Sequence, residues 1–444
     1  MIQPMADSNI RIISELKHFL EETSQMHSKR STYSLSPKDF TRTRKLDFKT
    51  LSLLILHSLK RSLSVELQDF FGHIGKESCT KQAFSEQRGK LKPSFLEDWN
   101  ALLVKSFYSN NTSIPKRWKG MLLWSIDGST TPLPNSKELR EKFGCPGSRQ
   151  GQSNPAARIC VLYDVMNHIA IKGLLQPYVE SEEKVVLDVL KGSELSQSLL
   201  LFDRGYPSYW LMYCLIDKQT HFVMRVPSNA NNTVKAFIDS DLSDITVDIY
   251  PSYKSMAQLR QMGIRISQTA PVKVRYVKVM LNTGEVEVLA TNLYDSSSYT
   301  IADLKEVYIM RWGIETFYGY VKEELQLGQF SGIRDICIRQ DFAANLFLFN
   351  LQSLIEKQCE PYIEKVCKTR MYKYKVNKNI SWASMKYRVV KLFLFRNTSS
   401  VLMELQHLFE RYLEPIRPGR KFPRTRRGRP NCKNYTLTNY KRAL

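Results

Sequence analysis

Two largely apolar runs, each followed by an aspartate, constrain the fold of this chain more than any other feature. Residues 121–126 (Met-Leu-Leu-Trp-Ser-Ile) lead into Asp127, and residues 198–202 (Ser-Leu-Leu-Leu-Phe) lead into Asp203. Short apolar runs bounded by turn residues are typical of strands buried on both faces. We therefore predict two buried strands, each with a carboxylate at its carboxyl end. A simpler interpretation stays open, in which each aspartate only caps a turn.

The segments around these runs predict an α/β protein, in which a mixed sheet is covered by helices. Alternating Val272–Met280 and the following Asn-Thr-Gly turn predict a hairpin within a β-rich insertion at residues 227–300. Apolar residues at helical spacing predict helices on both sides of this region. We expect further strands at residues 157–164, 168–175, 221–226 and 245–250, and helices at 48–59, 63–71, 181–190, 208–217, 342–356 and 382–409.

The charge balance restricts the class of partner. The chain has 65 Lys and Arg against 43 Asp and Glu, a formal charge of +22. Such a field favours polyanions, so nucleic acid is the leading partner and an anionic membrane surface the second. No apolar run approaches the roughly 20 residues that span a bilayer, and the start lacks a signal-peptide layout, so we expect a soluble intracellular protein. The eight cysteines show no metal-type spacing, which argues against zinc or a disulfide framework.

Basic side chains in three segments are candidate DNA contacts. Thr80 can cap a helix that carries Lys81 and Arg88, and the hairpin carries Lys273 and Arg275. The tail from residue 415 holds ten Lys or Arg, Arg426 and Arg427 among them, and a basic, aromatic loop is expected at residues 368–378. Two alternatives remain: an ordinary helical bundle with a solvated basic face, and a tail without a ligand.

A third segment places four different chemistries on one helical stripe. At about 100° per residue, Tyr308, Arg311, Glu315 and Lys322 share a face about 60° wide. Such a stripe suits a site that holds a cation together with phosphates, whereas an exposed Arg311–Glu315 ion pair is the plainer interpretation. Trp312 points off the stripe, so we weigh core packing against stacking on DNA.

Asp127, Asp203 and Glu315 together suit phosphodiester chemistry. Carboxylate oxygens can hold two Mg²⁺ ions about 4 Å apart, which activate the attacking oxygen and stabilise the leaving one. The two aspartates are too far apart in sequence for a loop motif, so the fold must bring them together.

These motifs carry a resemblance to a known family. The stretches Ile126-Asp-Gly-Ser-Thr130 and Phe202-Asp-Arg-Gly-Tyr206 and the spacing Tyr308-x2-Arg311-x3-Glu315-x6-Lys322 resemble the DDE transposases of bacterial insertion sequences, in the group with the YREK signature. The resemblance covers roughly residues 118–335 and implies an RNase H-like core. It implies that Asp127, Asp203 and Glu315 bind two Mg²⁺ (or Mn²⁺) ions and that Tyr308, Arg311 and Lys322 contact DNA phosphates.

The resemblance also implies cut-and-paste transposition. Double-stranded DNA is then the partner, as terminal inverted repeats and as target, bound by a homodimer in the bacterial cytoplasm at the nucleoid. A hairpin intermediate is implied, in which relatives stack an extruded base on an aromatic residue of the insertion, although this insertion contains no tryptophan. Tyr250, Tyr253, Tyr276 or Tyr294 could substitute for it.

Two other functions stay open beside transposition. The alternatives are a non-catalytic DNA-binding protein derived from a transposase and a nuclease of the same fold. We expect a helical DNA-binding domain at residues 1–117, a catalytic core at 118–226 and 301–356 around the insertion, and a helical, basic carboxyl-terminal region at 357–444.

Overall fold

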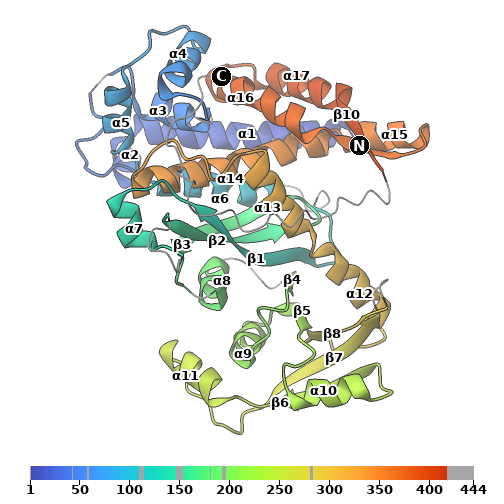
Figure 1. Cartoon of the computed structure of the whole chain (residues 1–444). Helices are drawn as coiled ribbons and strands as arrows, with labels where there is room; N and C mark the ends of the chain where they lie inside the picture. The colour runs from blue at the N-terminus through green and yellow to red at the C-terminus, as the bar shows by residue number, and fades with distance from the viewer. Residues whose placement is uncertain are drawn as a thin grey trace.

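The structure is a computed structural model that describes residues 2–42, 44–57, 60–109, 115–146, 154–180, 182–192, 197–280 and 284–417. Within these residues, a mixed sheet lies between a large layer of helices from both ends of the chain and a smaller group of helices (Figure 1). The predicted α/β class is confirmed.

The main sheet has eight strands in the order β3-β2-β1-β4-β5-β8-β7-β6. β4 runs parallel to both β1 and β5, and every other neighbouring pair is antiparallel. A second, two-stranded sheet joins β9 to β10. The bounds are β1 Leu122–Pro132, β2 Ala156–Asp164, β3 Ile169–Pro177, β4 Ser198–Phe202, β5 His221–Val226, β6 Asp244–Ile249, β7 Val272–Met280, β8 Val286–Thr291, β9 Lys373–Val376 and β10 Leu413–Ile416.

The helices fall into three runs along the chain. The first run precedes the sheet, the second is interspersed with its strands, and the third follows it. Their bounds are α1 Ile2–Gln25, α2 His27–Thr32, α3 Phe48–Leu56, α4 Leu63–His73, α5 Lys81–Arg88, α6 Ser94–Ser109; α7 Lys137–Phe143, α8 Glu182–Leu190, α9 Tyr209–Asp217, α10 Asn232–Asp239, α11 Tyr253–Gln261; and α12 Ile301–Met310, α13 Gly313–Glu323, α14 Asp335–Gln358, α15 Glu360–Lys368, α16 Lys378–Leu394, α17 Thr398–Arg411.

β4 shows why an uninterrupted apolar run forms a central strand. Leu199 and Leu201 lie in the core on one face of the sheet, with α12, α13 and part of α14. Leu200 and Phe202 lie in the core on the other face, with α8, α9 and α10. Both faces of β4 are therefore covered, as its sequence predicts.

The insertion at residues 227–300 differs from the prediction in two respects. Its expected strands form, but they extend the main sheet, because β8 pairs antiparallel with the edge of β5. The segment also contains two helices that were not predicted from the sequence, α10 and α11, which Asn231 and Ser252 cap through their side chains. Val277 faces one core and Val274 the other, so the added strands are apolar on both faces.

The helices at the two ends of the chain share one hydrophobic core. Trp99 of α6 stacks on Phe347 of α14 with ring centroids 4.5 Å apart and lies 4.9 Å from Phe393 of α16. α14 also packs against β3, so this helical layer covers one face of the sheet. The domain boundaries at residues 117 and 357 remain predictions from sequence, but the segments outside them pack as one layer in the described structure.

Candidate active site

The sheet register brings Asp127 and Asp203 side by side. β1 pairs parallel with β4 so that Trp124 lies opposite Leu200 and Ser125 opposite Leu201. Two residues further along each chain, the same register aligns Asp127 with Asp203. The fold therefore joins two carboxylates separated by 76 positions in the sequence.

The sequence predicted that Asp127 stands at the carboxyl end of its strand, and this prediction is wrong. β1 continues to Pro132 because β2 keeps pairing with it on its other side. β4 instead ends at Phe202, so Asp127 lies where β1 loses its parallel neighbour. The carboxylate is half-buried, and its Oδ1 accepts a hydrogen bond of 2.8 Å from the N–H of Gly128.

The segment from Tyr308 to Lys322 forms two helices, which corrects the prediction of one. α12 ends at Met310 and α13 begins at Gly313. Between them the chain tightens into i to i−3 hydrogen bonds, from the N–H of Arg311 to the carbonyl of Tyr308 and from that of Trp312 to Ile309. Gly313 permits this packing, since a Cβ there would approach Val165 Cβ to 3.2 Å.

Despite this break, the predicted stripe faces the aspartates. The Tyr308 hydroxyl donates to Asp203 Oδ1 over 3.4 Å. Arg311 Nη2 pairs with Glu315 Oε1 at 2.9 Å and lies 4.0 Å from Asp203 Oδ1. Glu315 and Asp203 therefore reach the same guanidinium. The plainer interpretation is also partly right, because the Arg311–Glu315 ion pair does form.

Lys322 reaches the same edge of the sheet from the far end of α13. Its Nζ donates to Ser129 Oγ over 2.5 Å, and the Tyr318 hydroxyl donates to the backbone carbonyl of Asp127 over 2.8 Å. Ser129 and Tyr318 are not among the site residues predicted from the sequence. The signal was present, since Ser129 lies on the same strand face as Asp127, and Tyr318 lies one helical turn from both Glu315 and Lys322.

Burial sets the electrostatics of the basic groups. Burial lowers the pKa of Lys322, and Asp127 offsets part of that effect. Burial alone would also lower the pKa of Arg311, but Tyr308, Asp203 and Glu315 outweigh it and raise the pKa. The Arg311 side chain is only 4% exposed, and its Nε is buried without a hydrogen-bond partner in the described part of the chain. An unused buried donor is costly, so a guanidinium placed this way suits an additional anionic ligand.

The three carboxylates suit divalent cations. They supply only oxygen donors, which Mg²⁺ and Mn²⁺ prefer, and the side chains of Asp203 and Glu315 are each 35% exposed. Among the described residues, the group of three whose ligand atoms all lie within 4.8 Å of one another is a different one, His57, Glu66 and Asp69.

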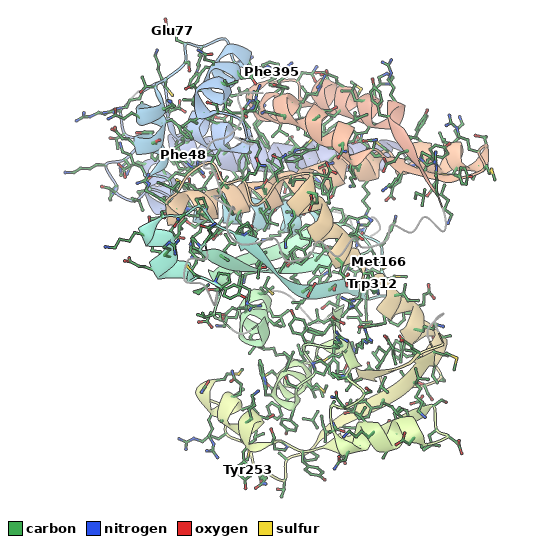
Figure 2. The ribbon with its side chains drawn as sticks, in the orientation of Figure 1. Phe48, Glu77, Met166, Tyr253, Trp312 and Phe395 are labelled. Atoms are coloured by element: carbon green, nitrogen blue, oxygen red, sulfur yellow. The ribbon has the colours of Figure 1, made fainter. Side chains whose placement is uncertain are left out.

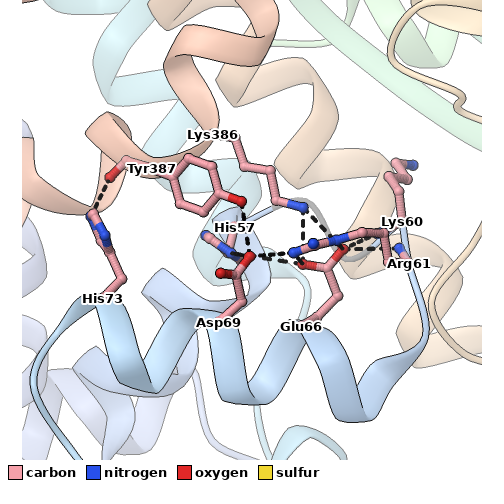
Figure 3. A network of polar contacts seen from close by, with 8 residues as sticks. All are labelled: His57, Lys60, Arg61, Glu66, Asp69, His73, Lys386 and Tyr387. Carbon is pink, nitrogen blue, oxygen red and sulfur yellow. Dashed lines mark hydrogen bonds and ion pairs between the residues drawn. The ribbon is translucent and has the colours of Figure 1, made fainter. Parts of the chain in front are cut away.

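The compact group at His57 has a structural explanation (Figure 3). Arg61 pairs with both Glu66 and Asp69, and Lys386 donates to both oxygens of Glu66 at 3.0 and 2.9 Å. Two fixed cations already balance the two carboxylates, so a metal ion would have to displace one of them. The network joins α4 to α16 and belongs to the packing of the helical layer.

Two predicted DNA contacts do not fit that role. Arg88 is 1% exposed and donates to Gln340 and Asp341, both at 2.7 Å. Arg275 is 1% exposed and pairs with Asp244 at 2.6 Å. Both arginines face inward because each finds a carboxylate there, which a local sequence pattern cannot reveal.

The other predicted contacts keep their status as predictions. Lys81 and Lys273 are exposed, whereas Arg426 and Arg427 lie outside the described residues. Trp312, labelled in Figure 2, is 52% exposed, so its interpretation as a core residue is wrong. The Arg311 guanidinium lies over the rings of both Trp312 and Tyr308, 5.4 and 5.6 Å from their centroids.

Among the tyrosines of the insertion, burial removes one candidate for stacking. Tyr276 is 2% exposed, whereas Tyr250, Tyr253 and Tyr294 are 59%, 78% and 43% exposed. Tyr253 lies on α11, on the opposite side of the view from the helical layer (Figure 2).

Comparison with known proteins places the chain in a family. The family model described as "Transposase DDE domain" matches residues 118–351, a range that contains β1 to β8 and both helices of the site. This is more than half of the chain, which therefore belongs to the DDE transposase domain family. The narrower YREK group remains a prediction.

Two individual proteins are also similar. The protein named "Putative transposase InsZ" of Escherichia coli (strain K12) is 30% identical over 103 residues, which are 23% of this chain and 34% of that protein. The chain thus matches about a third of that relative. A solved structure of the piggyBac transposase synaptic complex with hairpin DNA is 11% identical, with a TM-score of 0.42 over 96% of this chain and 88% of that one. A TM-score this low supports no structural conclusion.

In the described part of the chain, no helix combines the length and the apolar character that crossing a membrane requires.

Proposed function

We propose that this protein is a transposase that excises a DNA element by metal-dependent hydrolysis at its terminal inverted repeats and joins the freed 3′ ends to target DNA. One observation carries the proposal: the β1–β4 register aligns Asp127 with Asp203, which directly follows β4, and Arg311 connects Asp203 to Glu315. DDE transposase domains generally use divalent metal ions, and the oxygen-only donor set of this site is consistent with Mg²⁺ or Mn²⁺.

Each residue of the site then has a distinct role. Asp127, Asp203 and Glu315 would hold the two ions, which when bound activate the attacking oxygen and stabilise the leaving oxygen. Arg311 would orient a phosphate through its unused Nε and its planar fork, with Tyr308 beside it. Lys322, half-buried next to Ser129, would hold the neighbouring phosphate of the DNA end.

The bond changes in the two reactions are balanced without a further reactant. In hydrolysis, the oxygen of water bonds to phosphorus and the bond from phosphorus to O3′ breaks, which leaves a 3′-hydroxyl on the element. In strand transfer, this 3′ oxygen gives up its proton and bonds to a target phosphorus, while a target O3′ leaves and takes a proton. We propose an RNase H-like core for this chemistry, supported by the strand order β3-β2-β1-β4-β5.

We also propose that two copies act on paired DNA ends and that excision passes through a DNA hairpin. In that step the freed 3′ oxygen gives up its proton and bonds to a phosphorus of the opposite strand, while the flanking O3′ of that strand leaves and takes a proton. Water then reopens the hairpin by bonding to this phosphorus and releasing the 3′-hydroxyl. The exposed Trp312 beside Arg311 supports the hairpin step, because an exposed aromatic ring at the cleavage site can stack on an unpaired base.

Cleavage assays on the DNA that flanks the protein's own reading frame test this proposal. We expect Asp127→Asn, Asp203→Asn and Glu315→Gln each to reduce Mg²⁺-dependent cleavage by at least about 10³-fold, with DNA affinity changed by less than about threefold. Glu306→Gln removes an exposed carboxylate of α12 and serves as the matched control. Lys322→Ala should instead weaken or misplace binding of the DNA end.

The outcomes separate the competing functions. Full cleavage by any one of the three carboxylate variants would refute the proposed triad. Cleavage without joining of the cut ends would identify a nuclease. Binding without cleavage in both Mg²⁺ and Mn²⁺ would identify a non-catalytic DNA-binding protein.

A further inference from the structure

A projection formed by α15 and the β9–β10 sheet carries a cluster of basic side chains outside the candidate active site. Residues 360–376 and 411–417 contain seven Lys or Arg and three Glu. Glu360 pairs with Lys116, and Glu414 pairs with Lys375. We define the carboxyl-terminal basic patch as the remaining exposed cations, Lys365, Lys368, Arg370, Lys373, Arg411 and Arg417.

These six cations are available to a ligand. None of them forms an ion pair with any residue of the described ranges. Among the described residues 360–376 and 411–417, Glu364 is the one acid that forms no ion pair. Neighbouring cations repel each other at low salt, so a surface of this kind suits a polyanion that neutralises them together.

Aromatic rings lie beside two of these cations, Arg370 and Arg411. The Arg370 guanidinium stacks over Tyr374, 4.9 Å from the ring centroid, and that of Arg411 over Tyr412 at 5.5 Å. Tyr362 on α15 is 41% exposed. A stacked guanidinium group keeps its charge and has less conformational freedom to lose on binding, so it is well suited to donate hydrogen bonds to phosphate oxygens.

Part of the patch lies on a paired strand, although the sequence predicted a loop at residues 368–378. β9 pairs with β10 so that Tyr374 lies opposite Pro415. Asn377 fixes this sheet to the helical layer, because its side chain accepts from the N–H of Ile380 at the start of α16 and donates to Glu414. A paired strand binds with a smaller entropy cost than a flexible loop.

A chain of contacts connects the patch to the candidate active site. Glu360 at the start of α15 pairs with Lys116, whose backbone bonds the Asn167 side chain in the β2–β3 turn. Val165 in the same turn packs against Gly313, directly after Trp312. Figure 1 shows α15 and β10 on the same side of the view as α12.

We propose that the carboxyl-terminal basic patch binds the phosphate backbone of duplex DNA outside the cleaved position. The inference rests on the proposed function, since it supplies the DNA path beyond the carboxylates. Six unpaired cations with a single unpaired acid favour a polyanion such as the DNA backbone, because they can neutralise several phosphates together. The chain continues from Arg417 into the basic tail, so the patch extends a long run of positive charge.

The test compares two triple variants of the full chain that lose the same charge. Lys365→Ala/Lys368→Ala/Lys373→Ala removes half of the patch. Lys137→Ala/Lys191→Ala/Lys218→Ala removes three exposed lysines on or just after α7, α8 and α9. Binding to a random-sequence duplex is measured in chelator, across a salt series, so that cleavage plays no part.

Each lost phosphate contact lowers the slope of log affinity against log salt by about 0.9. We therefore expect the slope of the patch variant to be smaller in magnitude than that of wild type by about 1 to 3. If the two proteins bind equally at about 1 M salt, the variant then binds about 8- to 500-fold more weakly than wild type at about 0.1 M salt. The control variant should match wild type.

Equal affinity and slope in the two triple variants would overturn the inference, as would a wild type that does not bind the duplex. So would a patch variant that changes only the oligomeric state, seen by light scattering, or only binding to vesicles containing phosphatidylserine. Failure of the proposed function is read separately, from the Asp127→Asn cleavage assay.

Discussion

Replacement of Arg88 by methionine should weaken folding rather than DNA binding. The guanidinium bonds Gln340 through Nε, Ser331 through Nη1, and Cys337 O and Asp341 through Nη2. Every nitrogen of the group is used, and the bonds join α5 to α14 and the segment before it. Arg88→Met keeps much of the apolar stem while it removes all of these bonds.

The expected loss follows from the charge left behind. Breaking a buried ion pair by removing one partner costs about 3–5 kcal/mol in the free energy of unfolding. For a cooperative unit of about 150–250 residues, that corresponds to a fall of roughly 6–20 °C in Tm. Thermal unfolding followed by circular dichroism measures the shift, and duplex binding by fluorescence anisotropy measures affinity, which should stay within about twofold because a 1% exposed side chain cannot contact DNA.

Two further measurements test whether the unpaired charge of Asp341 causes the loss of stability. Burial alone would raise the pKa of this carboxyl, and Arg88 with Ser331 lowers it. Without Arg88 the pKa of Asp341 should rise, so the folded variant takes up a proton and its deficit should shrink as pH falls from 7 towards 4. Arg88→Met/Asp341→Asn should recover part of the loss, because no buried charge remains. Wild-type Tm together with a loss of duplex affinity in Arg88→Met would refute this reasoning and restore the predicted DNA contact.

Three further predictions concern the site and the helical layer. Arg311→Lys keeps the charge but loses the planar fork, so we expect cleavage to fall by on the order of 100-fold; an unchanged single-turnover rate would contradict a phosphate-orienting role. Trp312→Ala should weaken binding of a hairpin DNA end by roughly 1–3 kcal/mol with Tm unchanged, while Trp312→Phe keeps most of the affinity; a lower Tm at equal affinity would instead indicate a packing role. Burial lowers the pKa of His57 from 6.5 to about 4, so the unfolded chain binds more protons between these values and stability falls as pH falls through this window. His57→Phe should remove up to roughly 3 kcal/mol of that dependence. Urea titrations at pH 7 and 4.5 measure it, and an equal change in the free energy of unfolding between the two pH values in both proteins would rule this out.

Local sequence patterns determined the strands and helices well. The apolar run at residues 198–202 predicted a strand buried on both faces, and Thr80 caps α5 as expected, accepting from the N–H of Ala83. Alternation predicted the hairpin of β7 and β8. The sequence missed α10 and α11, whose short apolar faces are weak signals beside the strong alternation of the neighbouring strands.

The candidate site was predicted from spacing, but only tertiary structure decided which side chains meet. Asp127 and Asp203 become neighbours through the β1–β4 register, and Arg311 reaches both Asp203 and Glu315 although a helix boundary falls beside it. Arg88 and Trp312 differ from their predictions, because Arg88 pairs with the buried Asp341 of α14 and the Trp312 ring is exposed. Periodicity fixes which face of its own element a residue occupies, whereas the partner on that face comes from a distant part of the chain. The sequence by itself therefore determined the elements and the chemistry available, and the packing of α5, α12, α13 and α14 decided which of those groups serve the site and which serve the core.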